Sequence, residues 1–135
     1  MTKIKLISII TILVIVLAAI PVFTGCGKVA AYADPATENI LIAMNNEDYA
    51  SFSKDFDDTM KSELSKDVFP DFVAAVNGQV GDYIANSKDL NGFNIENGLT
   101  TAHYIIDFES MEDVELDVVF KKIDGKMMVV GLWFN

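Results

Sequence analysis

The chain contains no arginine, one cysteine and one histidine in its 135 residues. A single cysteine cannot form an intramolecular disulfide, so the core must stabilise the fold. One histidine and one cysteine also offer too few ligands for a transition-metal site, and we expect neither a metal nor a cofactor. The sequence lacks a Gly-rich phosphate-binding loop and a Gly-x-Ser-x-Gly motif, so phosphate sites and serine nucleophiles are not indicated.

Basic residues are scarce as well. The formal net charge is −10, whereas nucleic-acid binding needs a basic surface. We therefore expect no nucleic-acid partner. The same deficit argues against docking on anionic lipid headgroups, which attract clusters of lysine and arginine. A strongly acidic surface is typical of a soluble domain whose copies repel one another.

The longest apolar stretch of the chain lies at its N-terminus. Lys3 and Lys5 precede a largely apolar stretch over residues 6–23, and small residues then precede Cys26. This layout is typical of an export signal, with a positive start, a hydrophobic middle and small residues at the cleavage site. The cysteine after the small residues resembles the lipobox of prokaryotic lipoproteins, in which the signal is removed and the cysteine is lipidated.

This resemblance implies a division of the chain and a location. Residues 1–25 would be a signal peptide, residues 26–34 a lipidated Cys26 with a short flexible tether, and residues 35–135 a single domain. A lipid anchor would hold the domain at the extracytoplasmic side of the cell membrane. The alternative is an uncleaved N-terminal helix, since about eighteen apolar residues just span a bilayer. It gives the same orientation, because positive charge stays inside.

Three helices are predicted in the first half of the domain. Asp34 as N-cap and Pro35 in the first turn predict the start of a helix that ends near Asn45. Apolar residues at spacings of three and four over residues 49–64 predict a second helix. A third is predicted from about residue 65 to the glycines at 78 and 81.

The second half of the domain has the alternating pattern of strands. Strands are predicted over residues 102–108, 116–120 and 127–134, and weaker candidates lie at 83–87 and 93–95. Because helices come first and antiparallel strands follow, the order predicts an α+β fold with the N-terminal helices packed on one face of the sheet.

The dipeptide Asp124-Gly125 predicts a two-residue hairpin turn, which also sets the register of the last two strands. The expected cross-strand pairs are Phe120 with Val129, Val118 with Gly131, and Leu116 with Trp133. Trp133 would then lie in the core.

In this register, the hairpin face that points away from the core is unusually apolar. It carries Val119, Met128, Val130, Leu132 and Phe134. Such a face is too apolar to be fully solvated. It therefore predicts coverage by another part of the fold, a homodimer contact or a protein partner, in preference to a ligand groove.

Three separated motifs resemble an uncharacterised family, domain of unknown function 3887. They are Glu47-Asp48-Tyr49 with residues 52–61, the segment Gly78 to Tyr83, and the ending Asp124 to Phe134. The resemblance implies a cystatin-like, nuclear-transport-factor-2-like cone, in which a curved antiparallel sheet wraps around helices. It also implies an exported prokaryotic lipoprotein, standing alone or joined to a hydrolase domain, and it carries over no catalytic residues.

Few residues are candidates for chemistry. His103 and Asp107 share a strand face, but at about 3.3 Å rise per residue they lie too far apart for a direct hydrogen bond. We interpret His103 as a surface or interface histidine. The three aspartates at 55, 57 and 58 cannot wrap a calcium ion from helix turns, so they indicate a solvated face. The acidic run over 109–117 is typical of charge that prevents edge-to-edge aggregation. The alternative for this run is an interaction edge for a basic partner.

We therefore expect a non-enzymatic, membrane-tethered domain that binds a partner or assembles with itself. The alternative is a small-molecule binder, or an isomerase- or dehydratase-like enzyme, with a pocket between helices and sheet. For that alternative, His103, Tyr104 and Asp107 are the first catalytic candidates, by analogy with the superfold alone.

Overall fold

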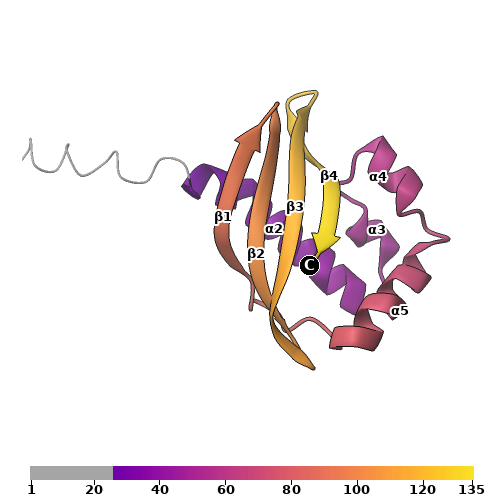
Figure 1. Cartoon of the computed structure of the whole chain (residues 1–135). Helices are drawn as coiled ribbons and strands as arrows, with labels where there is room; N and C mark the ends of the chain where they lie inside the picture. Colours follow the sequence, from indigo (N-terminus) through magenta and orange to yellow (C-terminus); the bar gives the residue numbers. More distant parts are fainter. Residues whose placement is uncertain (1–25) are drawn as a thin grey trace, which may run out of the picture.

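The computed structural model describes residues 26–135, and the expected signal peptide at residues 1–25 lies outside this range. In the described part, helices precede strands (Figure 1). The helices are α2 (Cys26–Asn45), α3 (Tyr49–Phe52), α4 (Asp58–Glu63) and α5 (Phe69–Val80). The strands are β1 (Asp89–Glu96), β2 (Leu99–Phe108), β3 (Met111–Ile123) and β4 (Lys126–Phe134). No helix within residues 26–135 is both long and apolar enough to span a membrane.

The strands form one antiparallel sheet in the order β1-β2-β3-β4. The sheet is curved and open, α2 crosses behind it, and α3, α4 and α5 gather beside β4 (Figure 1). Side chains along β2 alternate between buried and partly exposed from Thr100 onward, because successive residues point to opposite faces of a sheet. The architecture confirms the predicted α+β fold.

The core lies between α2 and the sheet and continues under the short helices. Phe52 is fully buried, and its ring centroid lies 4.9 Å from that of Phe56, 4.6 Å from Phe69 and 5.9 Å from Phe72. Tyr32 of α2 meets Phe120 of β3 edge-on at 5.1 Å. Aromatic pairs in such geometries add to the stabilisation that burial provides.

α2 begins earlier than the sequence predicted. Asp34 and Pro35 lie inside the helix, so Asp34 is not its N-cap. Helical spacing of buried residues continues upstream, because Val29 and Ala33 pack into the core. Proline costs the helix one N–H bond, and this packing outweighs the loss. The segment 27–34 is therefore helical, where a flexible tether was expected.

The helix predicted over residues 49–64 is instead two short helices, α3 and α4. Between them Phe56 forms a parallel bridge with Val129 of β4. The N–H of Asp57 donates to the carbonyl of Val129 (3.1 Å), and the N–H of Val129 donates to the carbonyl of Asp55 (2.7 Å). Periodicity missed this break because the buried residues of both helices face the same core.

Capping explains why α4 begins where it does. The carboxylate of Asp57 accepts a hydrogen bond from the N–H of Met60 at 2.9 Å. An N-cap aspartate satisfies one of the free N–H groups of the first turn. At the end of α5, Gly81 adopts a φ of 79°, which side-chain-bearing residues rarely reach, and the predicted end of this helix is confirmed.

The two weak strand candidates have different outcomes. Residues 93–95 belong to β1, as predicted. Residues 83–87 form no strand, and only Tyr83 makes an isolated bridge, with Phe108. The loop is held by α2 instead, because Glu38 accepts hydrogen bonds from the Tyr83 hydroxyl (2.6 Å) and from the N–H of Asn86 (2.8 Å).

The β3–β4 hairpin confirms the predicted turn and its first core pair. Asp124 and Gly125 have positive φ angles of 50° and 80°, as a two-residue hairpin turn requires. Phe120 lies opposite Val129, as expected. Beyond this pair a β-bulge leaves Val130 without a cross-strand partner, and the register moves by one residue.

The bulge exchanges the two faces of the rest of β4. Leu132 and Phe134 lie opposite the buried residues of β3, on the helix side, whereas Trp133 lies opposite Asp117 on the outer face. Trp133 is 55% exposed. The predicted core position of Trp133 and the two pairs that followed from it are wrong, because one extra residue in a strand turns every later side chain over.

Candidate functional site

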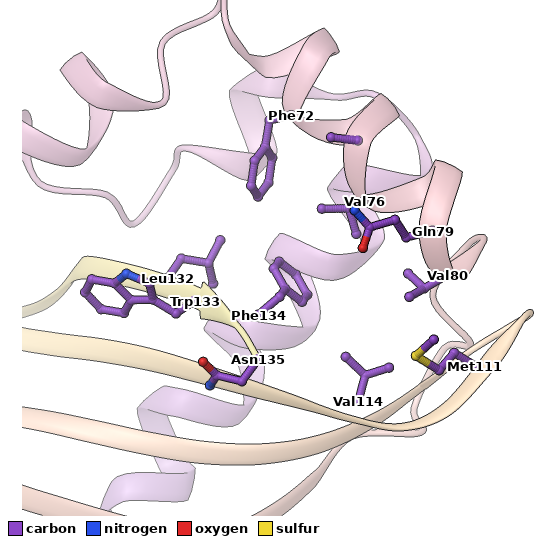
Figure 2. Close-up of a pocket in the computed structure, with 11 residues that line it drawn as sticks. Phe72, Val76, Gln79, Val80, Met111, Val114, Leu132, Trp133, Phe134 and Asn135 are labelled. Carbon is purple, nitrogen blue, oxygen red and sulfur yellow. The ribbon is translucent and has the colours of Figure 1, made fainter.

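An apolar groove lies between α5 and the C-terminal half of β4 (Figure 2). Its volume is about 420 Å³, within the range of roughly 300–1,000 Å³ that is typical of ligand sites. Three elements line it: Phe72, Ala75, Val76, Gln79 and Val80 of α5, Met111 and Val114 of β3, and the chain end from Leu132 to Asn135.

α5 supplies one wall because its apolar residues cover more than one face. Phe69 and Val73 are buried in the core. Phe72 and Val76 lie beside them on the helix and are only partly buried. Figure 2 shows Phe72 and Val76 reaching from α5 toward the β4 side of the groove. One face of α5 therefore anchors the helix, and the adjoining face remains accessible.

Leu132 and Phe134 supply the opposite wall, as a consequence of the bulge in β4. The ring centroid of Phe134 lies 6.3 Å from that of Phe72 and 6.2 Å from that of Phe108. The sequence analysis named Leu132 and Phe134 in the expected interaction face but placed them away from the helices, because a bulge leaves no mark in an alternating apolar pattern. Position 131 is a glycine, and the Trp133 ring rests on it. This pair of residues is the one local sign in the sequence that the strand is irregular here.

The groove is poor in polar groups. Among the described residues that line it none has a titratable side chain, and its polar side-chain groups are the amides of Gln79 and Asn135 and the indole N–H of Trp133. The Asn135 amide turns toward the outer face, where its Nδ2 lies 3.3 Å from Asp117 Oδ2. General acid–base catalysis needs a titratable group within hydrogen-bond reach of the substrate. The groove therefore suits contact with apolar groups.

His103 lies on the outer face of the sheet, away from the groove. Its Nδ1 is 2.6 Å from Oδ1 of Asp117, which stands directly opposite it on β3. The sequence led us to consider only Asp107 on the same strand. The register between β2 and β3, which places Asp117 opposite His103, was the information that the sequence analysis lacked. The two side chains are 44% and 30% exposed and border a shallow depression of about 220 Å³.

Tyr104 and Asp107, the other catalytic candidates, have separate surroundings. Tyr104 points into the core, and its hydroxyl donates to Asp34 Oδ1 at 2.6 Å. Burial, reinforced by this hydrogen bond, raises the pKa of Tyr104 far above its ordinary value. Asp107 Oδ1 accepts a hydrogen bond from the N–H of Asp113 at 3.0 Å. Tyr104 borders the same depression as His103, with its hydroxyl turned into the core, whereas Asp107 does not line it, so the structure does not bring all three candidates together there.

The structure also divides the five residues of the expected interaction face. Leu132 and Phe134 line the groove. Val119 lies opposite Gly131 and Met128 opposite Lys121, on the outer face of the sheet. Val130 is the extra residue of the bulge. The apolar residues thus serve two surfaces: Leu132 and Phe134 line the groove, and Met128 borders a separate hollow near the β3–β4 turn.

The aspartates before and at the start of α4 have structural partners. Asp55 Oδ1 lies 3.5 Å from the Nζ of Lys126, and Asp57 caps the helix. Within residues 26–135 no group of three or more His, Cys, Asp or Glu side chains is placed to hold a metal ion.

The chain belongs to the DUF3887 family, described as proteins of unknown function, whose family model matches residues 37–132. The match extends from α2 into β4 and includes α5, so it covers the groove except for Trp133, Phe134 and Asn135. No curated protein matches the chain.

Proposed function

We propose that this member of the DUF3887 family is a non-enzymatic binding module, tethered to the extracytoplasmic face of the cell membrane through lipidated Cys26. Its binding site is the groove between α5 and β4, which takes an apolar part of a protein partner. One observation carries the proposal: a concave site of about 420 Å³ has apolar residues from three elements and no titratable side chain among its described lining residues.

The course of α2 supports the tethered arrangement. Cys26 is the first described residue, and Val29 is already buried, so at 1.5 Å per residue about 5 Å of helix separates the expected anchor from the folded body. Tyr32 packs on Phe120, near the β3–β4 turn, whereas Asn45 donates a hydrogen bond to the carbonyl of Tyr83 at the other end of the sheet.

This course of α2 also decides where the groove would lie. The groove contains Met111 and Phe134, which belong to the end of the sheet away from the start of α2 (Figure 1). A domain anchored at Cys26 would therefore hold the groove away from the bilayer, where an extracytoplasmic partner reaches it. We also propose that the curved sheet with α2 across it is a member of the cystatin-like, nuclear-transport-factor-2-like superfold.

The tether is tested with the full chain in its own host. We expect the wild type in the membrane fraction, with the intact mass of residues 26–135 plus a lipid group. Cys26→Ser should lose the lipid mass. A wild-type protein that keeps the mass of the whole chain would contradict lipidation and indicate an uncleaved N-terminal anchor.

The groove is tested with two neighbouring alanines of α5. Ala74 and Ala75 are both exposed, but only Ala75 lines the groove. Ala75→Trp should fill the site and lower the fluorescence of the apolar probe 8-anilinonaphthalene-1-sulfonate several-fold, whereas Ala74→Trp should leave it unchanged. Equal fluorescence from both variants, with unchanged circular dichroism, would contradict binding in the groove.

A protein partner also differs from a small molecule in a measurable way. Native mass spectrometry of protein purified gently from its host should show the protomer without a small adduct. A reproducible extra mass that Ala75→Trp removes would identify a small molecule as the occupant and overturn the protein-partner part of the proposal.

A further inference from the structure

We infer that the occupant of the groove is an extended, basic segment of a partner protein, which adds to the free edge of β4 as a fifth strand. The inference rests on the proposed function, because it names what the groove binds. It depends on a further observation, the unpaired backbone of β4 beside the groove.

The direction of the backbone groups in β4 follows from one hydrogen bond at the chain end. The N–H of Asn135 donates to the carbonyl of Glu115 at 2.9 Å, so residue 135 turns its backbone toward β3. In an antiparallel pair, alternate residues turn their N–H and C=O groups toward and away from the partner. Phe134 therefore turns its groups away from β3, and so does Leu132, two residues earlier.

Val129 shows that this edge accepts a neighbour. Val129 lies on the same edge, and both of its backbone groups are paired with residues 55 and 57. That segment covers the edge only at Val129. In the described part of the chain, β4 has no strand beyond it, and Leu132 and Phe134 have no backbone partner on their open side.

The free edge and the groove select the same kind of ligand. A strand added beside Leu132 and Phe134 would satisfy their N–H and C=O groups with its own main chain. Its alternate side chains on the helix side would enter the space between Phe72 and Phe134 (Figure 2). Strand addition to a sheet edge uses this combination, with main-chain bonds for affinity and pockets for alternate side chains.

Charge indicates the remaining chemistry of the segment. Lys88 is the only lysine between residues 67 and 120, and its Nζ is already paired with Glu38 at 3.2 Å. Asp71, Glu112 and Asp113 are exposed and adjoin lining residues of the groove. An apolar segment with flanking lysines or arginines complements this rim. A second copy of this acidic chain would be repelled.

The probe is a short synthetic peptide in which valine alternates with threonine between terminal lysines, added to the full-length protein in detergent. Amide hydrogen exchange resolved to single residues is the readout. We expect the N–H groups of Leu132 and Phe134 to be protected at least ten-fold on binding. The N–H of Val129 should be unaffected, because it is already bonded to Asp55. A peptide with glutamate in place of lysine should bind at least ten-fold more weakly.

N-methylation separates strand addition from simple apolar contact. Methyl groups on the alternate amides that face β4 should abolish binding, whereas methyl groups on the other amides should preserve it. Binding that tolerates both patterns, or that leaves Leu132 and Phe134 unprotected, would overturn strand addition. Protection that appears when the protein alone is concentrated would assign the edge to a second copy and would also overturn it.

Failure of this inference is distinguishable from failure of the proposed function. If 8-anilinonaphthalene-1-sulfonate binds and Ala75→Trp blocks it, but no peptide protects the edge, the groove remains a binding site and strand addition is wrong. If Ala75→Trp changes neither probe nor peptide binding, the groove is not the site and both proposals fail.

Discussion

The two halves of the outer edge of β4 differ although they belong to one strand. At Val129 the edge is closed by the segment between α3 and α4, through two backbone hydrogen bonds of 2.7 and 3.1 Å. At Leu132 and Phe134 no segment of residues 26–135 covers the edge, which lies over an apolar groove. Proteins protect sheet edges with bulges and covering segments. We therefore interpret the closed half as a source of stability and the open half as a place for a partner.

The bulge at Val130 makes this difference possible. Before it, the buried residue is Val129; after it, Leu132 and Phe134 face the helices and Trp133 faces out. A regular strand would have placed Trp133 over the helices. The following predictions test the contrast, from the largest expected effect to the smallest.

Removing the side chain that anchors the closing segment in the core should have the largest effect. Phe56 is fully buried, and replacing a buried phenylalanine with alanine costs about 3–5 kcal/mol. Leu132→Ala, at the open half, should cost about 1–2 kcal/mol because Leu132 is only partly buried. Urea denaturation followed by circular dichroism measures both. Equal losses would show that the two halves contribute alike.

Acid should act on the loop beside α2 more than on β4, since the closure of β4 uses backbone groups that do not titrate. Burial by itself raises the pKa of Glu38, but hydrogen bonds from Tyr83, Asn86 and Lys88 outweigh it and hold that pKa below 4.5. A group whose pKa is lower in the folded than in the unfolded state stabilises the fold at pH values above its unfolded pKa. This stabilisation is lost as the pH falls through its folded pKa. We expect Glu38→Gln to lose about 1–3 kcal/mol at pH 7 and less toward acid.

The partner of Glu38 responds at the opposite end of the pH scale. Burial, and then the hydrogen bond to Glu38, raise the pKa of Tyr83 to about 12. The stabilisation that results from this raised pKa is complete below pH 10 and is lost as pH rises through 12. Tyr83→Phe should remove that alkaline loss. The free energy of unfolding of the wild type, Glu38→Gln and Tyr83→Phe, measured by denaturation across pH, tests the acid and the alkaline effect. If the three curves of this free energy against pH run parallel, both predictions are contradicted.

The cap of α4 should have a moderate effect. Asp57→Ala removes the carboxylate that accepts from Met60 but keeps the backbone bond to Val129, so it should cost about 1 kcal/mol. Asp58→Ala is the matched control, because Asp58 occupies the first turn without capping it, and it should cost a few tenths of a kcal/mol. A larger loss for Asp58→Ala would show that charge, and not the cap, starts the helix.

The smallest effect should come from the outer face at the bulge. A Cβ at Gly131 would collide with Cζ3 of Trp133, so Gly131→Ala should displace this exposed ring. We expect stronger quenching of Trp133 fluorescence by acrylamide and a stability change near 0.5 kcal/mol, as for surface sites. Gly92→Ala, with nothing within 4 Å, should change neither. Unchanged quenching in Gly131→Ala would show that the ring does not rest on Gly131.

Local signals in the sequence were sufficient for several elements. Alternation over 102–108 and 116–120, the Asp124-Gly125 turn and the end of the third helix at Gly81 are all as predicted, although that helix begins at Phe69 and not at about residue 65. The three motifs also indicated the family, which the match over 37–132 confirms. These features depend on periodicity and turn chemistry, which are properties of neighbouring residues.

Contacts between distant residues decided the rest. Pro35 lies inside α2 because Val29 and Ala33 pack on the sheet, and the helix over 49–64 breaks because Phe56 joins β4. His103 has Asp117 as its partner because β2 and β3 align in one particular register. Each of these outcomes depends on residues far apart in the chain.

The sequence by itself thus determined the order of helices and strands, the acidic surface and the family. Only the tertiary structure decided that β4 bulges at Val130, that Leu132 and Phe134 face α5, and that this half of the edge stays open. The physical reason is that periodicity reports which residues are apolar. The side to which a strand turns them depends on a register that is set by the strand's neighbours.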